Sequence, residues 1–71
     1  MDEAYEQVVK EAQTSFLAKG LSAQRAEKRA RNGVEHAVQV AADQPDPYYF
    51  FQTLGVSKEA FDRLEAATKV S

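Results

Sequence analysis

The chain has 71 residues, a formal net charge of −2 and no cysteine. A chain this short forms one domain at most, and without cysteine neither a disulfide nor a thiolate metal site can support its fold. Its charged fraction of 28% and hydrophobic fraction of 44% are typical of a folded domain rather than a disordered segment.

The sequence predicts a soluble, cytoplasmic protein. The N-terminal stretch MDEAYEQVVK is acidic, whereas a secretory signal peptide begins basic and then becomes apolar. No apolar run approaches the roughly 20 residues that a membrane helix needs. The lack of cysteine also fits a reducing compartment.

The first predicted helix runs from Asp2 to about Lys19. Acidic residues at its start complement the positive end of the helix dipole, and Gly20 follows its end as a common helix terminator. Steps of three and four residues place its apolar side chains on one stripe, formed by Tyr5, Val8, Val9, Ala12, Phe16 and Leu17.

The second predicted helix runs from Ala23 to about Ala42, with Ser22 as its N-cap. Small residues dominate its inner face and allow another helix to approach closely; they are Ala23, Ala26, Ala30, Gly33, Val34, Ala37, Val38 and Ala41. Gly33 costs about 1 kcal/mol relative to alanine in a helix, so we expect a bulky ring over it or a bend. The pair Asn32-Gly33 is also a common turn, and a break into two helices stays open.

The segment DQPDP ends the second helix, because proline cannot donate to a helical ladder and restricts the residue before it. Asp46 then suits an N-cap and Pro47 the first helical position. These residues predict a short helix over residues 47–54, closed by Gly55.

The last predicted helix opens at Ser57 and ends near Lys69. Val56 before the cap and Phe61 within the first turns are placed as a hydrophobic staple. The four helices predict an all-α protein with a single helical domain over residues 1–71. In this small four-helix domain, a long antiparallel helical hairpin carries the two short C-terminal helices packed on it.

Four consecutive aromatic residues, Tyr48 to Phe51, lie on the short helix and cannot all face one core, because successive residues point about 100° apart. Phe50, Phe51 and Leu54 share the inward face, Tyr49 points nearly the opposite way and Tyr48 lies on the flank. The tyrosines either fold over their own chain with their hydroxyls bonded or form an amphipathic patch of the type enriched at interfaces.

Basic residues are concentrated in the second helix, where RAEKRAR is the densest stretch. One polar strip beside the alanine face consists of Arg25, Arg29, Asn32 and His36, and Lys28 lies next to it. Such a strip can hold an anion, whether a phosphate backbone, RNA or an acidic protein surface. The alternative is a solvated helix face with local ion pairs to Glu27 and Glu35.

The stretch FFQTLGVSKEAFDRL resembles the turn of helix-turn-helix DNA-binding proteins, with a buried leucine, a glycine in the turn and a serine capping the recognition helix. The resemblance implies a nucleic-acid-binding regulator. That family commonly has a small residue where this chain has Phe51. The helix that would read DNA also carries Lys58 and Arg63 against three carboxylates, which oppose phosphate binding.

Catalytic chemistry is not indicated, because His36 is the single histidine and neither a metal-ligand cluster nor a glycine-rich phosphate loop is present. We expect no enzyme activity, no cofactor, no metal, no membrane association and no small-molecule substrate. The predicted function is a small protein–protein interaction module, an adaptor, inhibitor or regulatory protein. Its predicted binding residues are Tyr48, Tyr49, Arg25, Lys28, Arg29 and His36. Self-association as a homodimer stays open, and nucleic acid is the alternative partner.

Overall fold

The computed structural model describes residues 3–70, with the backbone alone for residues 69 and 70. Its elements are four helices, and no strand occurs in the described range: α1 (Glu3–Ala18), α2 (Ala23–Ala41), α3 (Tyr48–Gln52) and α4 (Lys58–Val70). The predicted all-α, four-helix architecture is therefore confirmed. Asp2, which the sequence placed in the first helix, lies outside the described residues.

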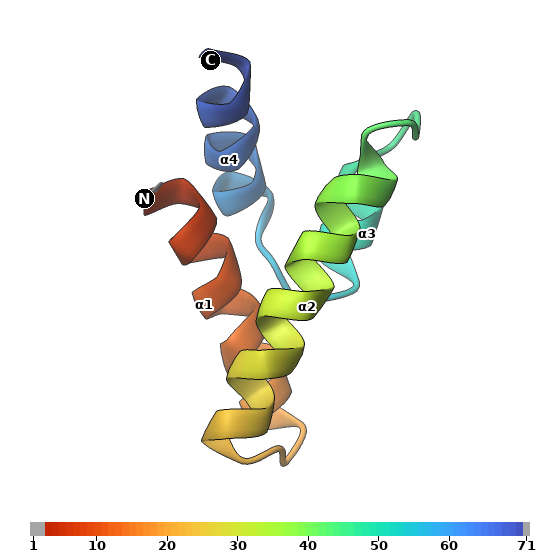
Figure 1. Cartoon of the computed structure of the whole chain (residues 1–71). Coiled ribbons are helices and arrows are strands. Elements are labelled where there is room, and N and C mark those ends of the chain that lie inside the picture. The colour runs from red at the N-terminus through yellow and green to blue at the C-terminus, as the bar shows by residue number, and fades with distance from the viewer. Residues whose placement is uncertain (1–2, 71) are drawn as a thin grey trace.

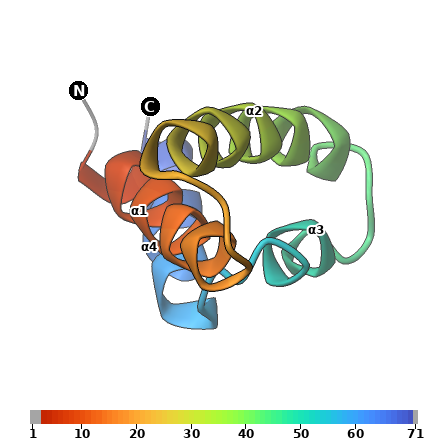
Figure 2. The ribbon, with the colours of Figure 1, turned by 90° about the horizontal axis from the view of Figure 1, so that it is seen from below.

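The helices α1 and α2 form an antiparallel hairpin whose arms are close at the connecting turn and diverge towards their other ends (Figure 1). Helix α4 packs against α1, and α3 packs against α2. Figure 2 shows the same arrangement from below, with α1 and α4 together on one side of the molecule and α3 on the other. None of the helices in the described part of the chain is both long and apolar enough to cross a bilayer.

Small side chains form the core face of α2, as predicted. The buried residues of this helix are Ala26, Ala30, Val34, Ala37 and Ala41. Two predicted members lie outside the core: Ala23, in the first turn, is exposed, and Val38 is 44% exposed. Val38 faces a groove that α3 and α4 border but do not fill. On α1, Leu17 is likewise exposed, at the last turn of the helix.

Gly33 is the place where the chain after α3 meets α2. The helix continues through Asn32 and Gly33, so the break that the sequence left open does not occur. A Cβ at position 33 would lie 2.9 Å from Cδ2 of Leu54. Of the ring or bend expected at Gly33, the ring is not what covers it: a leucine from the turn after α3 fills this space. Because position 33 is a glycine, the side chain of Leu54 can lie directly against the backbone of α2.

Two helices end in the same glycine motif. At the end of α1, Leu21 N–H donates to the Phe16 carbonyl at 3.3 Å and Gly20 N–H to the Leu17 carbonyl at 3.0 Å. This is a Schellman motif, which needs the positive φ of 99° at Gly20. The motif sets the residue after the glycine against the last turn of its helix, so that Leu21 lies next to Phe16.

The end of α3 repeats this pattern, with Val56 N–H donating to the Phe51 carbonyl and Gly55 N–H to the Gln52 carbonyl. Helix α3 spans Tyr48–Gln52 and is shorter than predicted, because residues 53–55 form the turn. Asp46 does not act as a side-chain cap. Among the described residues only its backbone carbonyl is bonded, to Tyr49 N–H at 3.3 Å, and Pro47 takes the boundary position with helical angles.

Both predicted serine caps are present. Ser22 Oγ accepts from Arg25 N–H at 3.3 Å at the start of α2, and Ser57 Oγ accepts from Ala60 N–H at 3.1 Å at the start of α4. Val56 and Phe61, the predicted staple, are both buried. These caps satisfy donors that a helix start would otherwise leave unpaired.

Candidate functional site

A groove of about 750 Å³ lies along the N-terminal part of α2, next to the end of α1. We call it the basic groove; its lining residues are Phe16, Leu21, Arg25, Lys28, Arg29, Asn32, Gly33 and His36. All four members of the predicted polar strip, and Lys28 next to them, lie in this lining, because spacings of three and four residues keep them on neighbouring positions of the helix surface.

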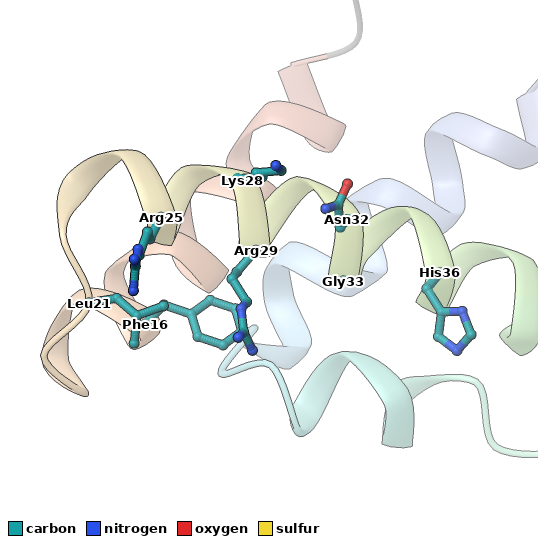
Figure 3. Close-up of a pocket in the computed structure, with 8 residues that line it drawn as sticks. All are labelled: Phe16, Leu21, Arg25, Lys28, Arg29, Asn32, Gly33 and His36. Carbon is teal, nitrogen blue, oxygen red and sulfur yellow. The ribbon is translucent and has the colours of Figure 1, made fainter.

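The long side chains of the groove point in two directions. Figure 3 shows Arg25, Arg29 and His36 on the side of α2 that faces Phe16, whereas Lys28 and Asn32 project from the opposite edge of the helix. The polar strip predicted from sequence is thus assembled, and its two arginines share the side on which Phe16 of α1 and Leu21 of the following turn lie.

The cations of the basic groove have no acidic partner in the part of the chain that the structure describes. The ion pairs found there involve Arg31, Lys58 and Arg63, and none involves the side chains of Arg25 or Arg29. Lys28 is likewise absent from every described pair. The predicted alternative, in which Glu27 and Glu35 neutralise the strip, does not hold for these three residues.

Glu27, one of the two acidic residues considered as partners for the strip, pairs with a cation outside the groove. Glu27 lies 3.7 Å from Arg31, and both guanidinium NH groups of Arg31 donate to Glu6 across the hairpin at 3.3 and 3.4 Å. These hydrogen bonds and the charge of Glu6 raise the pKa of Arg31. Arg31 therefore links α2 to α1, while the three cations of the groove stay free to meet an external anion.

The floor of the groove is apolar. Phe16 and Leu21 are both half-buried and are held together by the Schellman motif at the end of α1. The ammonium of Lys19 lies 5.4 Å from the centroid of the Phe16 ring, as a cation–π contact. The groove therefore combines free positive charge with partly exposed apolar surface, which the sequence did not predict as one site.

Tyr48 folds over its own chain. Its hydroxyl donates to the Val56 carbonyl at 2.9 Å, and its ring centroid lies 5.3 Å from that of Phe61. The ammonium of Lys58 lies 5.6 Å from the Tyr48 ring centroid. Of the two arrangements that the sequence left open for the tyrosines, Tyr48 thus adopts the packed one.

Tyr49 adopts the other arrangement. It is 57% exposed and makes an edge-to-face contact with Phe50 at 5.6 Å between ring centroids. Phe51 is buried, and Phe50 and Leu54 are half-buried against the core. The predicted division of the aromatic run is therefore correct for its inward face and for Tyr49. Binding of a partner by either tyrosine stays a prediction.

A second groove, of about 380 Å³, lies where α2 ends beside α3 and α4. Its apolar lining includes Val38, Phe51, Phe61 and Leu64. Sequence reasoning missed this groove because it depends on how three helices meet. The one signal in the sequence was Val38, which sits at the edge of the apolar stripe of α2.

The exposed face of α4 carries paired charges. Lys58 Nζ lies 2.8 Å from Asp62, and an Arg63 NH group lies 3.1 Å from Glu59. These are the two cations that the helix-turn-helix resemblance would direct to phosphates. Each has a carboxylate one turn away, so this face offers no free positive charge from either residue.

Comparisons with protein-family models, with curated proteins and with solved structures find no match for this chain. Function is therefore inferred from the geometry of its own side chains. Within the described residues, no three Asp, Glu or His side chains gather as metal ligands would.

Proposed function

We propose that this protein is a small, non-enzymatic protein–protein interaction module, an adaptor, inhibitor or regulatory protein, that binds another protein through the basic groove. One observation carries the proposal. Arg25, Lys28 and Arg29 have no acidic partner among the described residues, and the two arginines lie on the side of α2 that faces a partly exposed apolar floor. Arginine beside apolar surface is typical of protein interfaces.

Tyr49 supports the proposal as a second contact point. Its ring is 57% exposed, and an amphipathic ring presents a large contact area at a small cost in side-chain entropy. Tyr48 would contribute less directly, since its hydroxyl already serves the turn before α4. The proposal includes a cytoplasmic location, which the lack of cysteine favours.

The alternative is a nucleic-acid-binding regulator. The free cations of the groove favour any anion, including phosphate. The paired state of Lys58 and Arg63 and the net charge of −2 do not favour it. A protein partner is therefore the stronger proposal.

Photo-crosslinking tests the proposed function. A photo-reactive residue replaces His36, which lies on the same side of α2 as the two arginines, or, as a control, the exposed Lys10 on α1. In extract of the native host, the groove probe should give protein adducts that the double variant Arg25→Glu, Arg29→Glu loses. Equal protein adducts from both probes, or adducts with nucleic acid alone, would contradict the proposal.

A further inference from the structure

We infer that the basic groove takes an acidic segment of the partner protein that presents one bulky apolar side chain, an inference that rests on the proposed function. In this complex, carboxylates of the segment meet Arg25 and Arg29, and its apolar side chain packs on Phe16 and Leu21. The groove thus recognises the carboxylates and the apolar side chain together, and neither of these two features alone is sufficient for tight binding.

The charge and spacing of the two arginines match a pair of carboxylates. Arg25 and Arg29 are one helical turn apart, about 6 Å along the axis of α2, and both point to the side of Phe16 (Figure 3). A guanidinium binds a carboxylate through two parallel hydrogen bonds, a geometry that lysine cannot reproduce. Two acidic residues one turn apart on a partner helix have the matching spacing.

The floor of the groove selects an apolar side chain. Phe16 and Leu21 are only half-buried in the isolated chain, and the Schellman motif fixes their position. Covering them with an apolar group removes this surface from water. The Lys19 ammonium lies 5.4 Å from the centroid of the Phe16 ring and adds a further positive charge beside this floor.

The size and charge of the groove favour a short peptide segment over a nucleic acid. Its polar lining runs from Arg25 to His36, about 16 Å along the helix, which is the length of a few turns of a partner helix. Three free cations can release only a few counterions from the phosphate backbone of a nucleic acid, so they contribute little affinity for it. An acidic peptide with an apolar anchor adds burial of surface to the same charge interaction.

Fluorescence anisotropy with the full chain tests the inference. The probe is a labelled short helical peptide of glutamate and alanine with one central leucine. We expect binding that weakens with salt, and a loss of about tenfold when serine replaces the leucine. Replacing the glutamates by glutamine should abolish binding. A labelled single-stranded RNA of similar length should bind more weakly than the leucine peptide.

Variants of the chain provide the second arm. The double variant Arg25→Gln, Arg29→Gln should bind the leucine peptide with an affinity lower by about tenfold or more. The control double variant Lys10→Gln, Arg63→Gln removes the same charge elsewhere and should bind the leucine peptide with unchanged affinity. Leu21→Ser should reduce the difference between the leucine and serine peptides, with the helical circular dichroism signal showing that the fold is kept.

Several results would overturn the inference. Equal affinity for the leucine and serine peptides would do so, and so would tighter binding of the RNA than of the leucine peptide. Self-association of the chain that is lost in the double variant Arg25→Gln, Arg29→Gln would also do so, because a second copy of the chain would then occupy the groove. Groove-dependent protein crosslinks without binding of the leucine peptide would overturn this inference alone. Absence of such crosslinks would overturn the proposed function.

Discussion

Glu11 on α1 accepts the backbone N–H of Ser57 at 2.8 Å, so one carboxylate joins α1 to the point where α4 begins. Its other oxygen accepts from Gln7 Nε2 at 3.0 Å. Burial raises the pKa of Glu11, but hydrogen bonds from Ser57 and Gln7 together with the charge of Arg63 lower it by more. The net result is a pKa below its ordinary value of 4.5.

This contact predicts a loss of stability in acid. Because the pKa is lower in the folded state, Glu11 stabilises the fold above its ordinary pKa of 4.5, and this contribution disappears as pH falls through the folded pKa. Glu11→Gln should cost about 1 kcal/mol at pH 7, a low value for a charged hydrogen bond because the carboxylate is partly exposed. The free energy of unfolding of this variant should also fall less steeply as the pH is lowered.

Urea unfolding across the acid range measures this effect. The control is Glu35→Gln on the exposed face of α2, which should leave the profile unchanged. Parallel acid limbs for Glu11→Gln and the unaltered chain would show that this contact does not govern the acid response.

The contact between Gly33 and Leu54 predicts a coupling between the two positions. Alanine is worth about 1 kcal/mol over glycine inside a helix, but its Cβ would lie 2.9 Å from Leu54 Cδ2. Gly33→Ala should therefore gain less in the unaltered chain than in a Leu54→Ala background, where the gain should approach the full value. A double-mutant cycle by chemical denaturation measures this; equal gains in both backgrounds would rule the packing out.

Two glycines with positive φ should differ in their tolerance of alanine. Both Gly20 (φ 99°) and Gly55 (φ 87°) require a conformation that costs an L-residue about 1–2 kcal/mol. A Cβ on Gly55 would also lie 2.6 Å from the Cβ and Oγ of Ser15, whereas one on Gly20 meets nothing within 4 Å. Gly55→Ala should therefore lower the melting temperature clearly more than Gly20→Ala. Similar losses from both would contradict the close approach of Gly55 to α1.

Substitutions of the two tyrosines should differ in their effects, one lowering stability and the other lowering partner binding. Tyr48→Phe removes the hydrogen bond to the Val56 carbonyl and should cost about 1 kcal/mol of unfolding free energy. Tyr49→Ala removes an exposed ring and should leave stability nearly unchanged while weakening partner binding. Thermal melts of both variants measure the contrast; a greater loss of stability from Tyr49→Ala would reverse the assignment.

Sequence reasoning predicted the features that depend on local chemistry. The caps at Ser22 and Ser57, the glycine after α1 and the small-residue face of α2 follow from rules that act within a few residues. The polar strip was also predicted, because its spacing is a property of one helix. Asp46 failed as a cap, since Pro47 took the boundary position.

The remaining features depend on contacts between distant segments. That Leu54 rather than a ring covers Gly33, and that Glu11 reaches Ser57, follows only from how the helices pack. The same holds for the apolar floor that Phe16 adds on the side of α2 where Arg25 and Arg29 lie. Each of these pairs is separated by many residues, and no periodicity or motif in the sequence joins them.

The most direct test of the central claim, that the basic groove binds another protein, is the affinity of the partner identified by crosslinking for two charge-reversed chains. Arg25→Glu with Arg29→Glu changes the groove, and Lys10→Glu with Arg63→Glu changes the charge equally elsewhere. We predict a loss of about tenfold or more for the groove variant and almost none for the control. An equal loss in both would mean that overall charge, and not this groove, governs binding.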